Sequence, residues 1–193
     1  MKTAALVDEH RSAVRQMTRE GVDALMRLGV PLTAIKLASP APSTIILNRS
    51  GDLYQPVEDG IPAWIIPVRC ADPRYLDTIE ASDPLVAVAT GPIVDLLAFW
   101  GEPRRWALRR GVATSLGAVS RQHDNADPVR VHRDVLSWLR HSCSGLFLLA
   151  DGPFEAARIL RQCRRILAED ASHAAELRRL INWTPLLAEE AAE

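Results

Sequence analysis

The sequence lacks any apolar run long enough to cross a membrane. A membrane-spanning helix needs roughly 18–20 consecutive apolar residues, whereas glycine, proline and aspartate interrupt the most apolar stretch, residues 84–100. The N-terminus also lacks the unbroken apolar core of a secretory signal, because Asp8 and Glu9 follow its single lysine. We therefore expect a soluble, cytoplasmic protein with no membrane association.

Cysteine is scarce, and its spacing excludes a disulfide framework. Cys70, Cys143 and Cys163 are odd in number and form no C-x-x-C pair, unlike the even sets of small secreted domains. Reduced thiols in the cytoplasm are the simplest interpretation. Cys143 follows a predicted helix, whose C-terminal dipole disfavours a thiolate. We expect it to pack at a turn rather than act as a nucleophile.

Lysine is nearly absent, since 21 of the 23 basic residues are arginine. Arginine binds phosphate through two parallel hydrogen bonds, which suits a nucleic-acid partner. A GC-rich genome produces the same skew, and the sequence leaves both explanations open. The net charge of −1 hides an asymmetry: residues 1–103 carry 9 basic and 13 acidic side chains, while residues 104–179 carry 14 and 8. This asymmetry favours an anionic partner for the second half.

The common catalytic and nucleotide-binding motifs are missing too. There is no G-x-x-x-x-G-K-[ST] loop, no G-x-G-x-x-G and no G-x-S-x-G. His132, His141 and Cys143, with Asp124 or Asp127, could supply zinc ligands, but their spacing matches no closed zinc motif. The two histidines bound one predicted helix and would lie roughly 13 Å apart at its rise of about 1.5 Å per residue. No cofactor and no metal site are expected.

The first half is predicted to be a helix followed by an antiparallel sheet. An apolar stripe predicts a helix over residues 8–28, and short β-branched segments predict strands at 32–38 and 44–48. Turn residues 48–52 join the latter to a strand at 52–55. A strand at 63–68 is bracketed by Pro62 and Pro67, which mark strand ends or an edge. Further strands are expected at 85–89, 94–100 and 105–109.

The second half follows a polar linker at 120–128 and is predicted to be mixed α/β. We expect strands at 129–132, 145–150 and 166–168, and helices capped by Asp134 and Asp170. A helix at 153–163 gives residues 145–168 the order of a parallel β-α-β unit. The fold class is α+β. Residues 1–183 are expected to form a single compact domain, with parts 1–119 and 129–183, followed by a flexible acidic tail at 184–193.

The best candidate site is a basic surface next to tryptophan residues. On a strand, Arg105 and Arg109 share one face, whereas Trp106 and Leu108 share the other, so the indole is expected in the core. The proposed anion- or nucleic-acid-binding residues are Arg104, Arg105, Arg109, Arg110, Arg130, Arg133 and Arg140. An ordinary solvated sheet face is the alternative.

Three functions are therefore kept open. The first is a non-enzymatic accessory protein that binds nucleic acid or a nucleic-acid-associated protein. The second is a small metal-dependent hydrolase with polar residues at strand and helix ends. Its candidates are Asp95, His132, Asp151, Glu169, Asp170 and His173. The third is a partner-binding or oligomeric module that uses some of the five tryptophans at an interface.

Two segments carry a resemblance to known proteins. Residues 131–140 (VHRDVLSWLR) and 143–149 (CSGLFLL), with Tyr54-x-Pro56 and DLLAFW at 95–100 upstream, resemble small proteins from GC-rich proteobacterial genomes. Some of those proteins occur in prophage or mobile-element surroundings. The resemblance spans about residues 20–180 and involves packing residues, so it implies no activity and no site residues.

Overall fold

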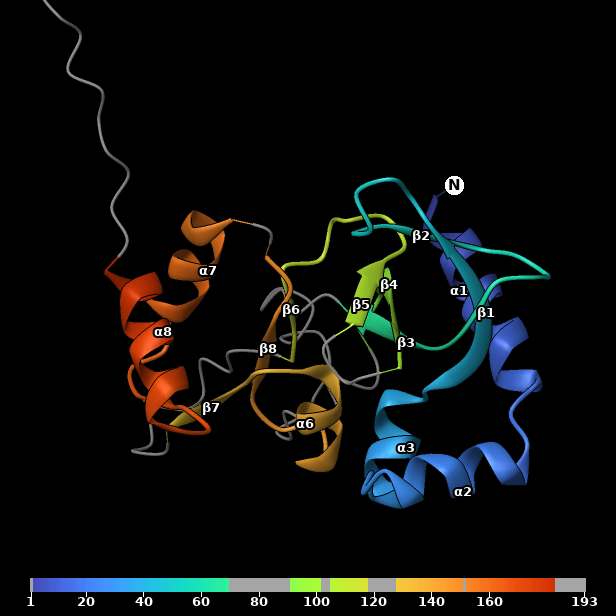
Figure 1. The fold of residues 1–193 in the computed structure, drawn as a ribbon, viewed down its shortest axis with the longest axis horizontal. Coiled ribbons are helices and arrows are strands. Elements are labelled where there is room, and N and C mark those ends of the chain that lie inside the picture. Colours follow the sequence, from blue (N-terminus) through green and yellow to red (C-terminus); the bar gives the residue numbers. More distant parts are fainter. Residues whose placement is uncertain (1, 70–90, 102–104, 118–127, 151, 183–193) are drawn as a thin grey trace, which may run out of the picture.

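The computed structural model describes residues 2–69, 91–101, 105–117, 128–150 and 152–182. It is an α+β fold with an N-terminal helix, an antiparallel sheet and a mixed sheet (Figure 1). The helices are α1 (Lys2–Arg15), α2 (Arg19–Arg27), α3 (Leu32–Ala38), α6 (Val135–Arg140), α7 (Pro153–Leu160) and α8 (Ala171–Ile181). The strands are β1 (Ala41–Leu47), β2 (Tyr54–Pro56), β3 (Ile61–Arg69), β4 (Ile93–Trp100), β5 (Arg105–Leu108), β6 (Ser115–Leu116), β7 (Val129–His132), β8 (Leu146–Leu148) and β9 (Ile166–Leu167).

The N-terminal region is more helical than the sequence predicted. The single helix over 8–28 is wrong, because Thr18 caps a separate helix α2 by accepting a hydrogen bond from the Gly21 N–H at 3.2 Å. The strand at 32–38 is also wrong, since this segment is α3. Its buried residues Ala34, Ile35 and Ala38 lie at helical spacing. A short apolar run does not distinguish a buried helix from a strand by itself.

The antiparallel sheet has the order β2-β1-β3-β4-β5 and curls until its two edges meet. The predicted hairpin of β1 with β2 is confirmed, and the predicted strands β4 and β5 also pair as neighbours in an antiparallel hairpin. The Leu108 N–H donates to the Asp52 carbonyl at 2.9 Å, and Leu53 bridges Leu108. Helix α1 packs on one face through Leu6 and Ala13. The predicted strand at 85–89 lies outside the described residues.

Pro62 and Pro67 lie inside β3 rather than at its ends. Pro62 is opposite Thr44 of β1, and Pro67 is opposite Leu96 of β4. The β1 pairing stops at Ile65, and the β4 pairing starts at the residue before it. Each proline therefore lies where β3 pairs with only one neighbouring strand. On the other side of β3 there is no described strand at that position, so the N–H that proline lacks is not needed for a hydrogen bond there.

The mixed sheet has the order β6-β8-β7-β9, with β7 parallel to both β8 and β9. The predicted β-α-β order is present, but β7 lies between the two strands of the predicted unit. Helices α7 and α8 cover one face, where Val131 and Leu146 join Leu177 in one apolar cluster. Phe147 points to the opposite face, which α6 covers. Figure 1 shows α7 and α8 together at one end of the molecule and α1 at the other.

A shared apolar cluster connects the two sheets. It joins Ile66 and Leu97 of the curled sheet to Trp138 and Phe147 of the second half. Trp106 meets the Phe147 ring edge-on, with centroids 5.9 Å apart. The prediction that Trp106 turns toward the core is thus confirmed. Among the described residues, no helix is both long and apolar enough to cross a membrane.

Candidate functional site: a pocket at the carboxyl ends of parallel strands

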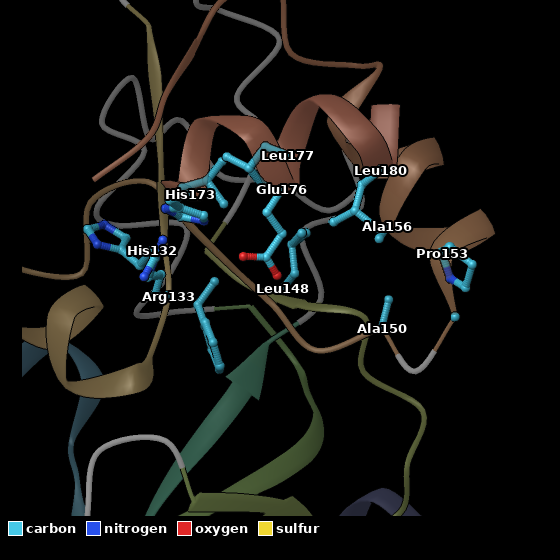
Figure 2. A pocket seen from close by; sticks show the side chains of 13 residues that line it. His132, Arg133, Leu148, Ala150, Pro153, Ala156, His173, Glu176, Leu177 and Leu180 are labelled. Carbon is cyan, nitrogen blue, oxygen red and sulfur yellow. The ribbon is translucent and has the colours of Figure 1, made fainter. Parts of the chain in front are cut away.

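A pocket of about 490 Å³ opens at the carboxyl ends of β7 and β8, between α7 and α8 (Figure 2). The chain runs from β7 to β8 on one side and then crosses back to β9 on the other side of β7. Open α/β sheets bind ligands at such a reversal of strand order, because the crossover helices diverge there and leave a crevice. The topology therefore singles out this edge of the sheet.

The pocket combines an apolar wall with polar groups from α8. Leu148, Leu177 and Leu180 form much of the wall, and the N-terminus of α7 closes one side. His173 and Glu176 are three residues apart on α8, so they share the helix face that lines the pocket. Figure 2 shows both side chains reaching from α8 toward the strands. This amphipathic lining is typical of a small-molecule site.

Arg133 supplies a partly unsatisfied cation to the same pocket. Its Nη2 donates to the Asp170 carboxylate at 3.0 Å, but its Nε is buried with no hydrogen-bond partner among the described residues. Asp170 also caps α8 by accepting the His173 N–H at 2.8 Å, which confirms the predicted cap. Asp170 is thus committed to internal bonds, whereas the buried Nε of Arg133 has no acceptor among the described residues.

His173 presents a neutral ring to this space. The Glu169 N–H donates to its Nδ1 at 3.3 Å, so the ring proton of the neutral form lies on Nε2. Burial, and then the charge of Arg133, lowers the pKa of His173 below its ordinary value of 6.5. The pocket therefore offers donors from Arg133 and His173 and an acceptor from Glu176.

A second polar cluster lies beside the pocket and is structural. The Nε2 of His132 donates to the Ser144 carbonyl at 2.8 Å, and its Nδ1 lies 3.1 Å from the Ser137 hydroxyl and 3.3 Å from Glu169. Ser137 also donates to Glu169. A catalytic triad uses the two ring nitrogens separately, one for serine and one for the acid. Here one nitrogen faces both groups, so His132 is not arranged to activate Ser137.

The proposed hydrolase residues are only partly brought together. His132, Glu169, Asp170 and His173 gather at the ends of β7 and β9. Asp95 is fully buried in β4, within the other sheet, and Asp151 lies outside the described residues. In the part of the chain that the structure describes, no three His, Cys, Asp or Glu side chains are arranged to hold a metal ion.

The separation expected for His132 and His141 is wrong. Their ring centroids are only 5.0 Å apart. The expectation placed both residues on one helix, whereas His132 belongs to β7 and the chain turns at Asp134 before α6 begins. Cys143 behaves as predicted: it is buried at the turn after α6, and burial raises the pKa of its thiol to about 12.

The seven predicted arginines have different surroundings. Arg109 forms an ion pair with Glu9 at 2.9 Å, and Arg140 donates to the Leu28 carbonyl at 2.7 Å. Arg133 lies in the pocket. The remaining residues are exposed Arg105 and Arg110, half-buried Arg130, and Arg104 outside the described residues. Binding of nucleic acid by this set stays a prediction.

Sequence reasoning missed Glu176 and the pocket. The spacing of His173 and Glu176 on a predicted helix was an available signal for a shared face. No such signal predicted the position of β7 between β8 and β9, because the order of parallel strands depends on which distant segments pair and not on the local sequence pattern.

Removing the Ser137 hydroxyl should make stability less dependent on acid pH. Burial alone would raise the pKa of Glu169, but hydrogen bonding, chiefly from the Ser137 hydroxyl, outweighs it and holds the pKa below its ordinary value of 4.5. This stabilisation is present above that value and is lost as pH falls through the folded-state pKa. Ser137→Ala should lower the free energy of unfolding by about 1 kcal/mol near neutral pH.

Urea unfolding at about pH 6 and pH 3.5 tests this expectation, and the difference between the two pH values should shrink in Ser137→Ala. Ser144→Ala is the matched control, because the exposed Ser144 contacts His132 only through its backbone carbonyl. An unchanged pH dependence in Ser137→Ala would show that the hydroxyl does not stabilise the Glu169 carboxylate.

Comparison of this chain with known protein families, curated proteins and solved structures found no match.

Proposed function

We propose that the protein binds the phosphate-bearing end of a nucleotide in the pocket at the carboxyl ends of β7 and β8. The observation that carries the proposal is the position of this pocket at the reversal of strand order, with Arg133, Glu176 and the N-terminus of α7 around one space. Its volume of about 490 Å³ lies within the roughly 300–1,000 Å³ typical of small-molecule sites.

Each part of a nucleotide has a chemical counterpart in the pocket. A phosphate would accept from the guanidinium of Arg133, whose Nε has no partner among the described residues. Sugar hydroxyls would donate to Glu176. The base would contact the leucine wall. The neutral form of His173 adds an N–H donor without further charge.

This proposal keeps the role expected from the sequence. The protein would act in the cytoplasm as an accessory factor for nucleic acid, and the bound phosphate would belong either to a free nucleotide or to the end of a strand. The basic second half would attract either source. The link to mobile elements suggested by the resemblance belongs to the same proposal.

Calorimetric titration with nucleoside monophosphates and a 5′-phosphorylated oligonucleotide tests the proposal. We expect Arg133→Gln to weaken binding about tenfold, because a charge-assisted hydrogen bond to phosphate is lost. Glu176→Gln should weaken the binding of ribonucleotides more than the binding of 2′-deoxynucleotides. Arg178→Gln is the control, because Arg178 is exposed on α8 and does not line the pocket.

The two sources of phosphate give different results. A free nucleotide is indicated if monophosphates bind as well as the oligonucleotide and salt has little effect. A strand end is indicated if only the phosphorylated oligonucleotide binds and salt weakens it steeply. Absence of binding by every ligand, or equal affinity of Arg133→Gln and wild type, would overturn the proposal.

A further inference from the structure

A second pocket, of about 480 Å³, lies between α1 and the adjoining ends of β3 and β4. It shares no residue with the pocket described above. Its polar side chains include His10, Arg11 and Arg69, and its apolar ones include Val7, Val14 and Ile93. Among its described lining residues there is no carboxylate. The described lining therefore contains basic side chains and no acidic one, and Arg11 alone among them has an acidic partner, Asp8, outside the pocket.

Arg69 is the central group of this pocket. It ends β3 at a register irregularity, and its Nη1 donates to the Gly91 carbonyl at 2.6 Å. Its Nε is buried without a hydrogen-bond partner, and none of the ion pairs found within the described ranges includes Arg69. A half-buried guanidinium stays charged, and desolvating it without a counter-charge is unfavourable. An anion in the pocket would remove this penalty.

The neighbouring groups reinforce that chemistry. His10 is buried on α1, and its Nε2 lies 2.8 Å from the Ser39 carbonyl. Arg11 is exposed and contacts Asp8 at 3.1 Å. The nearest acid along the helix, Glu9, is engaged elsewhere, by Arg109 at 2.9 Å and by the Tyr54 hydroxyl at 3.2 Å. The charge of Arg69 is therefore not balanced by α1.

We propose that this pocket binds a phosphate group, held by the Arg69 guanidinium with Arg11 at the entrance. The planar guanidinium offers parallel N–H donors that match two oxygens of a phosphate. Val7, Val14 and Ile93 would contact the organic part of the ligand. This site is independent of the nucleotide pocket, because α1, β3 and β4 build it, whereas β7, β8, α7 and α8 build the other.

Inorganic phosphate is the probe, with acetate as the carboxylate comparison, at constant ionic strength set with chloride. We expect phosphate to raise the melting temperature of the wild-type protein more than acetate does. Arg69→Met should lower the phosphate affinity by at least about tenfold. Without added anion it should be as stable as wild type or more so, because it removes an uncompensated charge.

Three further variants complete the test. Arg11→Gln should weaken the binding of phosphate severalfold, which keeps the proposal falsifiable if Arg69→Met fails to fold. Arg49→Gln, at an exposed turn outside the pocket, should bind like wild type. Arg133→Gln should also leave phosphate binding by this pocket unchanged, which separates this site from the nucleotide pocket. Equal phosphate affinity of wild type, Arg69→Met and Arg11→Gln would overturn the proposal, as would stronger stabilisation by acetate.

Discussion

Gly145→Ala should lower the free energy of unfolding by about 3 kcal/mol or more, one of the largest losses expected from a single methyl group here. Gly145 begins the approach to β8 with φ of +84°, and a Cβ at this position would lie 2.3 Å from the Arg130 carbonyl oxygen of β7. That oxygen belongs to backbone and cannot rotate away, so β7 and β8 would have to separate.

The close approach continues into the next strand. A Cβ on Gly117, after β6, would lie 2.0 Å from the Gly145 carbonyl oxygen. The backbone after β6 therefore contacts the backbone before β8, which in turn contacts β7. Both contacts are close enough to require glycine, at Gly117 and at Gly145. Because β7 and β8 also build the pocket for which nucleotide binding is proposed, Gly145→Ala should impair ligand binding as well as stability.

Urea unfolding measures the loss, and Gly101→Ala is the control. Gly101 also has a positive φ, +59°, but no atom of the described residues lies within 4 Å of the added Cβ. It should lose only about 1 kcal/mol, the cost of the left-handed conformation for a residue with a side chain. For a chain of this length, the difference corresponds to a melting temperature lower by roughly 4–8 °C. Equal losses in the two variants would show that the close backbone contact is not rigid.

Asp95→Asn should lower the free energy of unfolding by about 3–4 kcal/mol. The Asp95 carboxylate is completely buried. Four backbone N–H groups donate to it, those of Leu96, Arg110 and Val112 at 2.9 Å and that of Ala113 at 3.3 Å. Asparagine has nearly the same volume, but its NH₂ group would replace one carboxylate oxygen and leave two of the four N–H groups without an acceptor.

The same substitution at an exposed site provides the control for Asp95. Asp23 is exposed on α2, so Asp23→Asn should change stability by no more than about 0.5 kcal/mol. Thermal and urea unfolding of both variants should show the difference. If Asp95→Asn lowered the free energy of unfolding as little as Asp23→Asn, water would have to accept the hydrogen bonds of the backbone N–H groups in the loop after β5. The result bears on function, since Asp95 was a candidate hydrolase residue and the structure makes it the anchor of that loop.

Several elements could be predicted because their signals are local. The turn at residues 48–52 and the short connection between the apolar strand β4 and β5 specify hairpins between segments that are neighbours in sequence. Asp134 and Asp170 cap α6 and α8 through their own oxygens and the backbone three residues on. The inward direction of Trp106 follows from the two-residue period of a strand.

Other elements depend on partners far away in sequence. Residues 32–38 become α3 because its small buried face packs against α6, more than 90 residues later in the chain. Pro62 and Pro67 are tolerated inside β3 only because β1 and β4 pair with different parts of it. His132 and His141 come within 5.0 Å because a turn, rather than a continuous helix, separates them.

The sequence by itself determined the α+β class, most strand and helix positions in the second half, and the charge asymmetry between the two halves. Only the tertiary structure placed β7 between β8 and β9 and so created a pocket at the reversal of strand order. The tertiary structure also places Arg69 and His10 in one pocket and buries Asp95 in the core. The physical reason is that hairpins, caps and faces follow from short-range geometry, whereas strand order and charge burial depend on the packing of the whole chain.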